Sequence, residues 1–294
     1  MKLKTSIFMN FLLMSLAMTS VAWSDSNTYD FKVTVHGKGQ PMLLIPGLSN
    51  AAEVWDTTVE KYQGQYEMHT VTLPGFAGQP ALKNKEEFLT QVRDQLLAYI
   101  KNQKWQKPVV VGHSLGGYVS LLMAIEQPTL FDKIIIVDAV PFIPALTVPT
   151  ATEESSKAMA DGMKTQMASQ SEEMRSASLD MILATMITDP EQIKIAKKWG
   201  MDSDPDSVNQ AMYEMMTQDI RQEIEVIKSP TLIMGSWIAY QAYGMSNARL
   251  AESYGAQYKS LEGHQLAITD KGKHFIMWDD PEFYFTTLNK FLNQ

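Results

Sequence analysis

The amino-acid sequence predicts an α/β fold, a mostly parallel sheet flanked by helices, with a helical cap inserted before the last strands. Short apolar runs alternate along the chain with segments whose apolar residues recur at helical spacing. Some runs, such as 109–111 and 134–137, are apolar at every position, which is typical of parallel strands buried on both faces. The stretch 141–227 contains no strand-like run and is too long for one crossover, so we expect it to form the cap.

Each element of this fold has its own local signal. Alternation of polar and apolar residues over 31–37 indicates a half-exposed strand. Further strands are expected at 41–47, 68–75, 108–114, 133–139, 230–236 and 266–269, and helical spacing covers 85–101, 115–126, 247–254 and 282–292. Asp280 followed by Pro281 predicts a helix N-cap with proline at the first helical position.

The chain is expected to divide into a signal peptide (1–24), a core in two pieces (25–140 and 228–294) and the cap (141–227). The cap is rich in methionine, with ten methionines between Met159 and Met216. Methionine fills irregular cores, so most of them are expected to be ordinary core residues. A few could line an adaptable apolar pocket beneath a lid.

The first residues have the order of a secretory signal peptide. Two lysines precede an apolar stretch, 7–17, and small residues follow, among them Ala22 and Ser24. Cleavage is expected after one of these two residues. An uncleaved membrane anchor is the alternative, but polar residues leave too short an apolar span for stable membrane insertion. We expect an exported protein, periplasmic or secreted.

Composition excludes several classes of function. The formal net charge of −8 disfavours nucleic acids and anionic membrane surfaces as partners. The chain has no cysteine, which excludes disulfides, thiol catalysis and cysteine-ligated metals. No group of histidines and carboxylates has metal-ligand spacing, so we expect neither a metal nor an organic cofactor.

The segment GHSLGG, residues 112–117, stands where a strand gives way to a helix. A strand ending at 111 and a helix beginning near 115 leave room only for a tight, strained bend with Ser114 at its tip. On such a bend Gly112 and Gly116 approach each other closely, and a side chain at either position would clash. The following helix directs free N–H groups at Ser114, which suits a developing oxyanion. The segment therefore predicts a nucleophile elbow.

A serine hydroxyl becomes a good nucleophile only with a base in reach and a third group to orient that base. Of the five histidines, His274 follows the last expected strand and precedes the final helix, so it can reach back over Ser114. The other four are expected elsewhere: on early strands for His36 and His69, in a turn or at the surface for His264, and pointing away from the elbow for His113.

Five segments together resemble the α/β-hydrolase family, in its esterase-like branch with a helical cap: LLIPGLSNAAEVW, TLPGFAG, VVVGHSLGGYVSLLMA, IIIVDAVPF and GKHFIMWDDPEFYFTTLNKFL. The resemblance runs from about residue 30 to the C-terminus and is weakest over the cap. It implies a triad of Ser, Asp or Glu, and His in that chain order. It also implies an oxyanion hole formed by the backbone N–H groups of Leu48 and Leu115.

The acid departs from the family's common pattern. Most relatives carry it just beyond the strand that follows the cap, where this chain reads IMGSWIAYQAYG and has no carboxylate. The remaining position used in the family is the end of the strand before the cap, which Asp138 occupies. A purely structural role for Asp138 is the alternative. Asp270, Asp279 and Asp280 are closer to His274 in sequence but are expected in turns and helix caps.

These residues predict a serine hydrolase that cleaves a small or medium apolar carboxylic ester through an acyl-enzyme intermediate. Ser114 would be the nucleophile, His274 the base and Asp138 its partner. Apolar and aromatic residues near the predicted rim suggest the substrate pocket: Phe76, Phe142, Trp237 and Tyr240. Two alternatives stay open, namely the same triad acting on an amide, lactone or carbon–carbon bond, and a weakly catalytic binding module.

Overall fold

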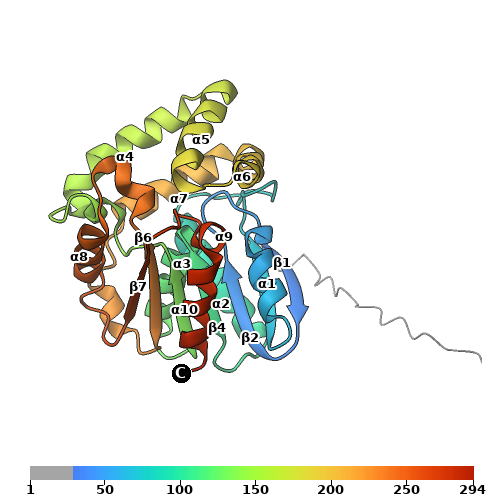
Figure 1. The fold of residues 1–294 in the computed structure, drawn as a ribbon. Helices are drawn as coiled ribbons and strands as arrows, with labels where there is room; N and C mark the ends of the chain where they lie inside the picture. Colours follow the sequence, from blue (N-terminus) through green and yellow to red (C-terminus); the bar gives the residue numbers. More distant parts are fainter. Residues whose placement is uncertain (1–28) are drawn as a thin grey trace, which may run out of the picture.

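The computed structural model describes residues 29–294, apart from the side chains of residues 242 and 243, so the predicted signal peptide lies outside the described part. A seven-stranded sheet runs through the molecule in the order β1-β3-β2-β4-β5-β6-β7 (Figure 1). Only β1 is antiparallel to its neighbour. The strands span Lys32–Gly37, Gln40–Ile45, Tyr66–Thr72, Val109–His113, Lys133–Val137, Thr231–Ser236 and Gln265–Thr269. The predicted fold class is confirmed.

The central strands are apolar because both of their faces are covered. In β2, Leu43 and Ile45 belong to one hydrophobic cluster, whereas Met42 and Leu44 belong to the cluster on the opposite face. The same alternation divides Val110 from its neighbours in β4. Successive side chains of a strand point to opposite faces, so a continuous apolar run supplies two cores at once.

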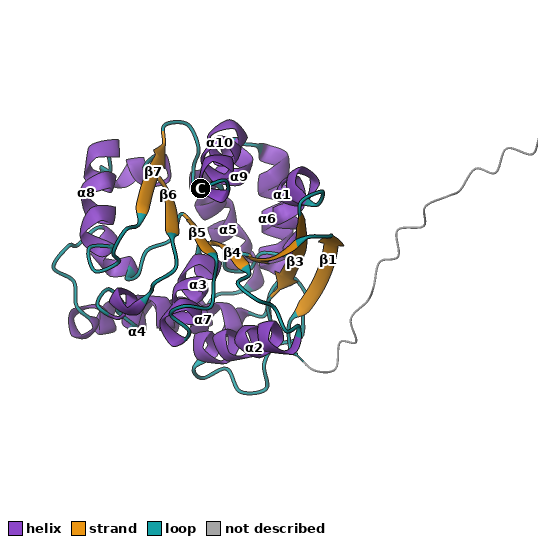
Figure 2. Ribbon diagram, turned by 90° about the horizontal axis from the view of Figure 1, so that it is seen from below, coloured by secondary structure: helices purple, strands orange, loops and turns teal. Residues whose placement is uncertain are grey.

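Helices cover the two faces of the sheet, as Figure 2 shows. Helices α2 (Phe88–Asn102), α3 (Leu115–Glu126) and α8 (Asn247–Gln257) pack into one cluster. Helices α1 (Asp56–Tyr62), α9 (Ile276–Asp279) and α10 (Pro281–Leu292) pack into the other. Asp280 caps α10 by accepting a hydrogen bond from the N–H of Phe283, with Pro281 at the first helical position, as predicted.

Four helices stand between β5 and β6: α4 (Glu153–Ala168), α5 (Glu172–Met186), α6 (Pro190–Asp202) and α7 (Pro205–Thr217). Short 3-10 helices flank them, η2 (Ile143–Leu146) before and η3 (Glu223–Val226) after. In Figure 1 these helices lie together over one end of the sheet, the end at which β5 leads into them. They form a cap over the carboxyl ends of the strands, which is where α/β sheets place their ligands.

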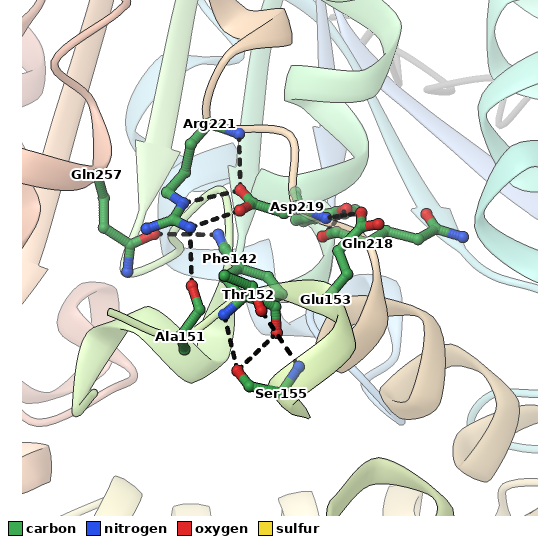
Figure 3. A network of polar contacts seen from close by, with 10 residues as sticks. Phe142, Ala151, Thr152, Glu153, Ser155, Gln218, Asp219, Arg221 and Gln257 are labelled. Carbon is green, nitrogen blue, oxygen red and sulfur yellow. Dashed lines mark hydrogen bonds and ion pairs between the residues drawn. The ribbon is translucent and has the colours of Figure 1, made fainter. Parts of the chain in front are cut away.

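The two ends of the cap are joined by a polar network (Figure 3). Arg221 binds the carboxylate of Asp219 with two nitrogens and also donates to the carbonyl of Ala151, 3.0 Å away. Its guanidinium lies over the ring of Phe142, 5.1 Å from the centroid. The side-chain oxygen of Gln257 in α8 accepts from the N–H of Phe142. The network therefore fixes the root of the cap to the core.

The methionines of the cap are less buried than the sequence suggested. Of the ten, Met215 and Met216 are buried. Four are exposed, between 36 % and 68 % of their surface: Met159, Met163, Met174 and Met181. The expectation that most of them fill the core is wrong, because α4 and α5 pack mainly on α7 and α6 and leave their outer sides uncovered.

Candidate active site

The elbow has the strained geometry that the sequence predicts. Ser114 has φ of 52° and ψ of −120°, a conformation that non-glycine residues rarely adopt. A Cβ on Gly112 would lie 2.2 Å from the carbonyl oxygen of Gly116, and one on Gly116 would lie 2.2 Å from that of Ile45. The N–H of Ser114 donates to the carbonyl of Val137, which ties the bend to β5. Ser114 itself is partly exposed at the tip.

His274 lies on the loop between β7 and α9, and hydrogen bonds to the backbone of adjacent residues hold this loop in place. The hydroxyl of Ser236, at the end of β6, donates to the carbonyl of Gly272 over 2.6 Å. The N–H of Phe275 donates to the carbonyl of Met186 at the end of α5, so the cap also contacts this loop. The imidazole is largely buried, with 8 % of the residue exposed. These contacts fix where the ring can point.

Asp138 and His274 are brought together from positions 136 residues apart in the chain. Nδ1 of His274 donates to Oδ2 of Asp138 over 2.6 Å, and the carboxylate is buried. The other oxygen, Oδ1, accepts from the N–H of Ser236 and from the hydroxyl of Tyr254, each at 2.8 Å. Three donors thus surround a carboxylate that has no contact with water to stabilise its charge.

His113 contacts the ring of His274, a supporting role that the sequence did not predict. Its ring lies against the ring of His274, with centroids 4.7 Å apart, and its Nε2 donates to the carbonyl of His274 over 3.0 Å. Complete burial and the neighbouring His274 hold the pKa of His113 well below its ordinary value of 6.5. An uncharged His113 therefore supports the loop that carries His274. Its place directly before the elbow serine was the signal that could have found it.

The loop after β2 lies against Ser114. A Cβ on Gly47 would be 3.2 Å from Cβ of Ser114 and 3.0 Å from Nδ1 of His113. The N–H of Asn50 donates to the carbonyl of Gly47, and this turn exposes part of Leu48. Leu115 is the first residue of α3, so its N–H has no acceptor within the helix. Both candidate oxyanion donors therefore lie on segments that contact Ser114.

The four candidate pocket residues lie in different environments. Phe76 packs against Phe88 in the core, and Phe142 lies under Arg221 at the root of the cap; both are fully buried and expose no surface to a ligand. Trp237 and Tyr240 are partly exposed on the turn after β6, which continues as η4 (Ile238–Tyr243). Trp237 directly follows Ser236, whose N–H donates to Asp138, so this turn begins beside the site.

The remaining histidines and Asp270 lie in the structural roles expected of them, whereas Asp279 ends α9 and caps none of the described helices. His36 and His69 lie on β1 and β3, and Nδ1 of His264 donates to the carbonyl of Leu261 in a turn. Asp270 and Asp279 accept hydrogen bonds from Asn247 and Thr188. Within the described residues, no cluster of three or more potential ligands could hold a metal ion. In the same part of the chain, no helix combines the length and hydropathy needed to cross a membrane.

Comparison with known proteins places this geometry in a family. The model of the alpha/beta hydrolase family matches residues 42–287. A pimeloyl-[acyl-carrier protein] methyl ester esterase of Legionella pneumophila (strain Lens) is 21 % identical over 258 residues, which cover 87 % of this chain and 97 % of the relative. A similarly named protein of Aliivibrio salmonicida is 32 % identical over 105 residues, covering 36 % of this chain and 38 % of the relative.

Solved structures share the fold at low sequence identity. A hydrolase from Pseudomonas aeruginosa PA01 superposes with a TM-score of 0.74 at 13 % identity, covering 95 % of this chain and 100 % of its own. An enol-lactonase from Burkholderia xenovorans LB400 gives a TM-score of 0.72 at 14 % identity, with coverages of 90 % and 96 %. With the family model spanning most of the sequence, the chain belongs to the alpha/beta hydrolase family.

Proposed function

We propose that this hydrolase is a serine esterase whose catalytic triad is Ser114, His274 and Asp138. The observation that carries the proposal is the 2.6 Å hydrogen bond from His274 to buried Asp138, at the rim where Ser114 occupies a strained elbow. A structural role for Asp138 alone would not require an imidazole partner. The esterase names of the sequence relatives support the same reaction class.

In the proposed reaction, Oγ of Ser114 attacks the ester carbonyl carbon while Nε2 of His274 takes the hydroxyl proton. Asp138 holds the imidazole in the required tautomer and stabilises its positive charge. The N–H groups of Leu48 and Leu115 bind the oxyanion, and each should lower the barrier by about 3 to 4 kcal/mol. The tetrahedral intermediate collapses as His274 returns the proton to the leaving alcohol. Water, deprotonated by His274, then releases the acid from Ser114.

We propose a small or medium ester with an apolar acyl or aryl group as the substrate. Trp237 and Tyr240 lie on the turn beside Asp138, and they offer aromatic surface to such a group. The relatives are named for a methyl ester substrate, which is compatible with a small leaving alcohol. No cofactor is required for this chemistry.

Labelling with a fluorophosphonate tests the assignment of each residue. Wild type should be labelled and should hydrolyse short nitrophenyl esters, whereas Ser114→Ala and His274→Ala should lose both activities. In Asp138→Asn the amide faces Nδ1 of His274 and favours the wrong tautomer, so turnover should fall by ~10⁴-fold. Full-rate labelling of Asp138→Asn would contradict the assignment of Asp138 as the acid of the triad. A wild-type protein that is not labelled would contradict the proposed esterase function.

A substrate panel decides between the ester and other bonds. Matched amide, lactone and β-diketone substrates with the same acyl group should be turned over more slowly than the ester. Thermal stabilisation by these compounds without turnover of any of them would instead indicate a binding protein.

We also propose that the chain is exported by its N-terminal 24 residues. Expression of the full chain should give a mature protein outside the cytoplasm that begins after Ala22 or Ser24. Sequencing of the N-terminus after cell fractionation checks this, and an intact Met1 in the cytoplasmic fraction would contradict it.

A further inference from the structure

We infer that Tyr254 is a positioning residue, which acts through Asp138 to set the orientation and basicity of the imidazole of His274. The inference deepens the proposed function and rests on it. The hydroxyl of Tyr254 orients the carboxylate of Asp138, as that carboxylate orients the imidazole of His274.

The hydrogen bonds of Asp138 divide between its two oxygens. Oδ2 faces only His274, whereas Oδ1 accepts from both Tyr254 and the N–H of Ser236. Two donors on one oxygen fix the plane of the carboxylate and draw negative charge away from the oxygen that binds the imidazole. The backbone adds to the constraint, because Asp138 has φ of 48° and its N–H donates to the carbonyl of Met234 over 2.7 Å.

The fold makes room for the ring of Tyr254 at this place. Tyr254 comes from α8 and is 1 % exposed, and it reaches Asp138 across β6. A Cβ on Gly235 would lie 3.1 Å from Cε1 of Tyr254, so a larger residue in β6 would push the ring away. Burial and the carboxylate of Asp138 raise the pKa of Tyr254 well above 10, so its hydroxyl stays protonated and remains a donor at neutral pH.

The neighbouring strand supplies the second donor. Ser236, at the end of β6, donates its N–H to Oδ1 of Asp138. Asp138 follows the end of β5, where the hydroxyl of Tyr254 from α8 reaches the same oxygen. Tyr254 and Ser236 together hold Oδ1 in place.

Three tyrosines and one histidine lie near Asp138 and His274 in the described part of the chain. Tyr254 comes from α8, Tyr258 directly follows that helix, and Tyr240 comes from η4; their pKa values are raised by burial and by the carboxylate of Asp138. From β4, His113 faces the ring of His274, and burial keeps it uncharged. The pKa values of the tyrosines are raised away from the acid limb, and Tyr258→Phe leaves His113 unchanged, so comparison of Tyr254→Phe with Tyr258→Phe isolates the contribution of the Asp138 and His274 pair.

Tyr258 provides a matched control for Tyr254. Tyr258 directly follows α8 and is fully buried. Its hydroxyl donates to the carbonyl of Ala139 over 2.8 Å. Tyr254→Phe and Tyr258→Phe therefore delete the same group from the same region, but only the first deletion removes a donor from Asp138. The two variants should lose similar stability.

The test is the pH profile of kcat/KM for a short nitrophenyl ester, measured for wild type and both variants. Tyr254→Phe should lower kcat about tenfold with little change in KM, because the carboxylate that orients the imidazole is held less firmly. The acid limb of its profile should move to higher pH by about half a unit, because a carboxylate with one donor fewer stabilises the imidazolium better. Tyr258→Phe should keep the wild-type profile. In the Asp138→Asn background, Tyr254→Phe should cost nothing further.

Proton NMR supplies a readout that does not depend on activity. The Nδ1 proton of His274 should give a far-downfield signal that Tyr254→Phe shifts and Tyr258→Phe does not. If Tyr254→Phe fails to fold, fluorotyrosine incorporated into Tyr258→Phe should move the acid limb to lower pH, because it strengthens the donor. Equal effects of the two variants, or an unmoved profile and signal, would overturn the inference. A folded wild type that shows the signal but hydrolyses no ester would instead overturn the proposed function.

Discussion

At the residue scale, the elbow depends on Gly116. A Cβ there would lie 2.2 Å from the backbone oxygen of Ile45 and 2.6 Å from that of Pro46, and neither atom can move without shifting β2 or its loop. We expect Gly116→Ala to destabilise the protein by about 1 to 3 kcal/mol and to abolish fluorophosphonate labelling. Urea unfolding and labelling rates measure the two effects.

Gly162→Ala is the matched control for this substitution. Gly162 lies inside α4, where an added Cβ would meet nothing within 4 Å. Alanine is the better helix former, so stability should rise by about 0.5 to 1 kcal/mol with labelling unchanged. If Gly116→Ala were labelled as fast as wild type, the close contact at the elbow would not matter for function.

The burial of His113 predicts a pH dependence of stability. The pKa of His113 is well below 6.5 in the folded state, so the unfolded chain binds a proton that the folded protein excludes. Stability from this group is therefore complete above pH 6.5 and falls by about 1.4 kcal/mol for each pH unit of acidification until the folded pKa is reached. Denaturant unfolding from pH 8 to 5 should show a shallower slope in His113→Gln. Identical slopes in both proteins would contradict a neutral, buried His113.

The sequence predicted the proposed catalytic residues better than the residues that hold them in place. Ser114 and His274 could be predicted because local patterns mark them, a strand-turn-helix junction and a loop after the last strand. Asp138 could be chosen only because the usual acid position lacks a carboxylate. Tyr254 could not be found, because its role depends on a buried hydroxyl that meets Asp138 across β6, and no local pattern encodes such a contact.

At the element scale, the sequence predicted the strands within about three residues but missed short helices. The central strands are signalled by continuous apolar runs, and the burial of both faces explains why. Helix α1 has only seven residues, and η4 follows the loop after β6, so neither is long enough to show helical periodicity. The outward side of the cap was mistaken for core because methionine is compatible with both environments.

Helix α2 begins on a contact from the cap. Its N-cap residue, Glu87, has φ of 52° and makes no side-chain capping bond. Instead, the buried carboxylate of Glu214 in α7 accepts from the N–H groups of Phe88 and Leu89, at 2.7 and 2.8 Å. A carboxylate at a helix N-terminus satisfies free donors and faces the positive end of the dipole. A residue of the helical cap domain therefore supplies the N-terminal hydrogen-bond acceptor of a core helix.

Removing that carboxylate should weaken the whole fold. Glu214→Ala leaves two N–H groups of α2 without their acceptor in a buried place, so unfolding free energy should fall by about 3 kcal/mol. Glu154→Ala is the control, since Glu154 is exposed in the first turn of α4. Denaturant unfolding of both variants measures the difference. Equal stability of the two would mean that water can replace Glu214.

At the scale of the whole molecule, most of the net charge lies in the cap. Residues 141–227 contain 15 Asp and Glu but only 7 Lys and Arg, whereas the rest of the chain has 18 of each. Several basic groups of the cap are occupied by local ion pairs: Lys194 with Glu191, Lys197 with Asp180 and Lys198 with Asp202. The cap therefore places a negative potential over the end of the sheet at which Ser114 lies.

That potential predicts selectivity by substrate charge. Among nitrophenyl esters with acyl chains of equal length, one ending in a carboxylate should have a kcat/KM several-fold below that of its uncharged analogue at low ionic strength. The gap should narrow near 0.5 M salt, about where the Debye length falls below 5 Å. Charge reversal in the cap, Glu154→Lys with Glu172→Lys, should narrow it at low salt, while Glu60→Lys on α1 should not. If the difference in kcat/KM between the two esters changed neither with salt nor in the cap variants, the selectivity would arise from the pocket walls and not from the charge of the cap.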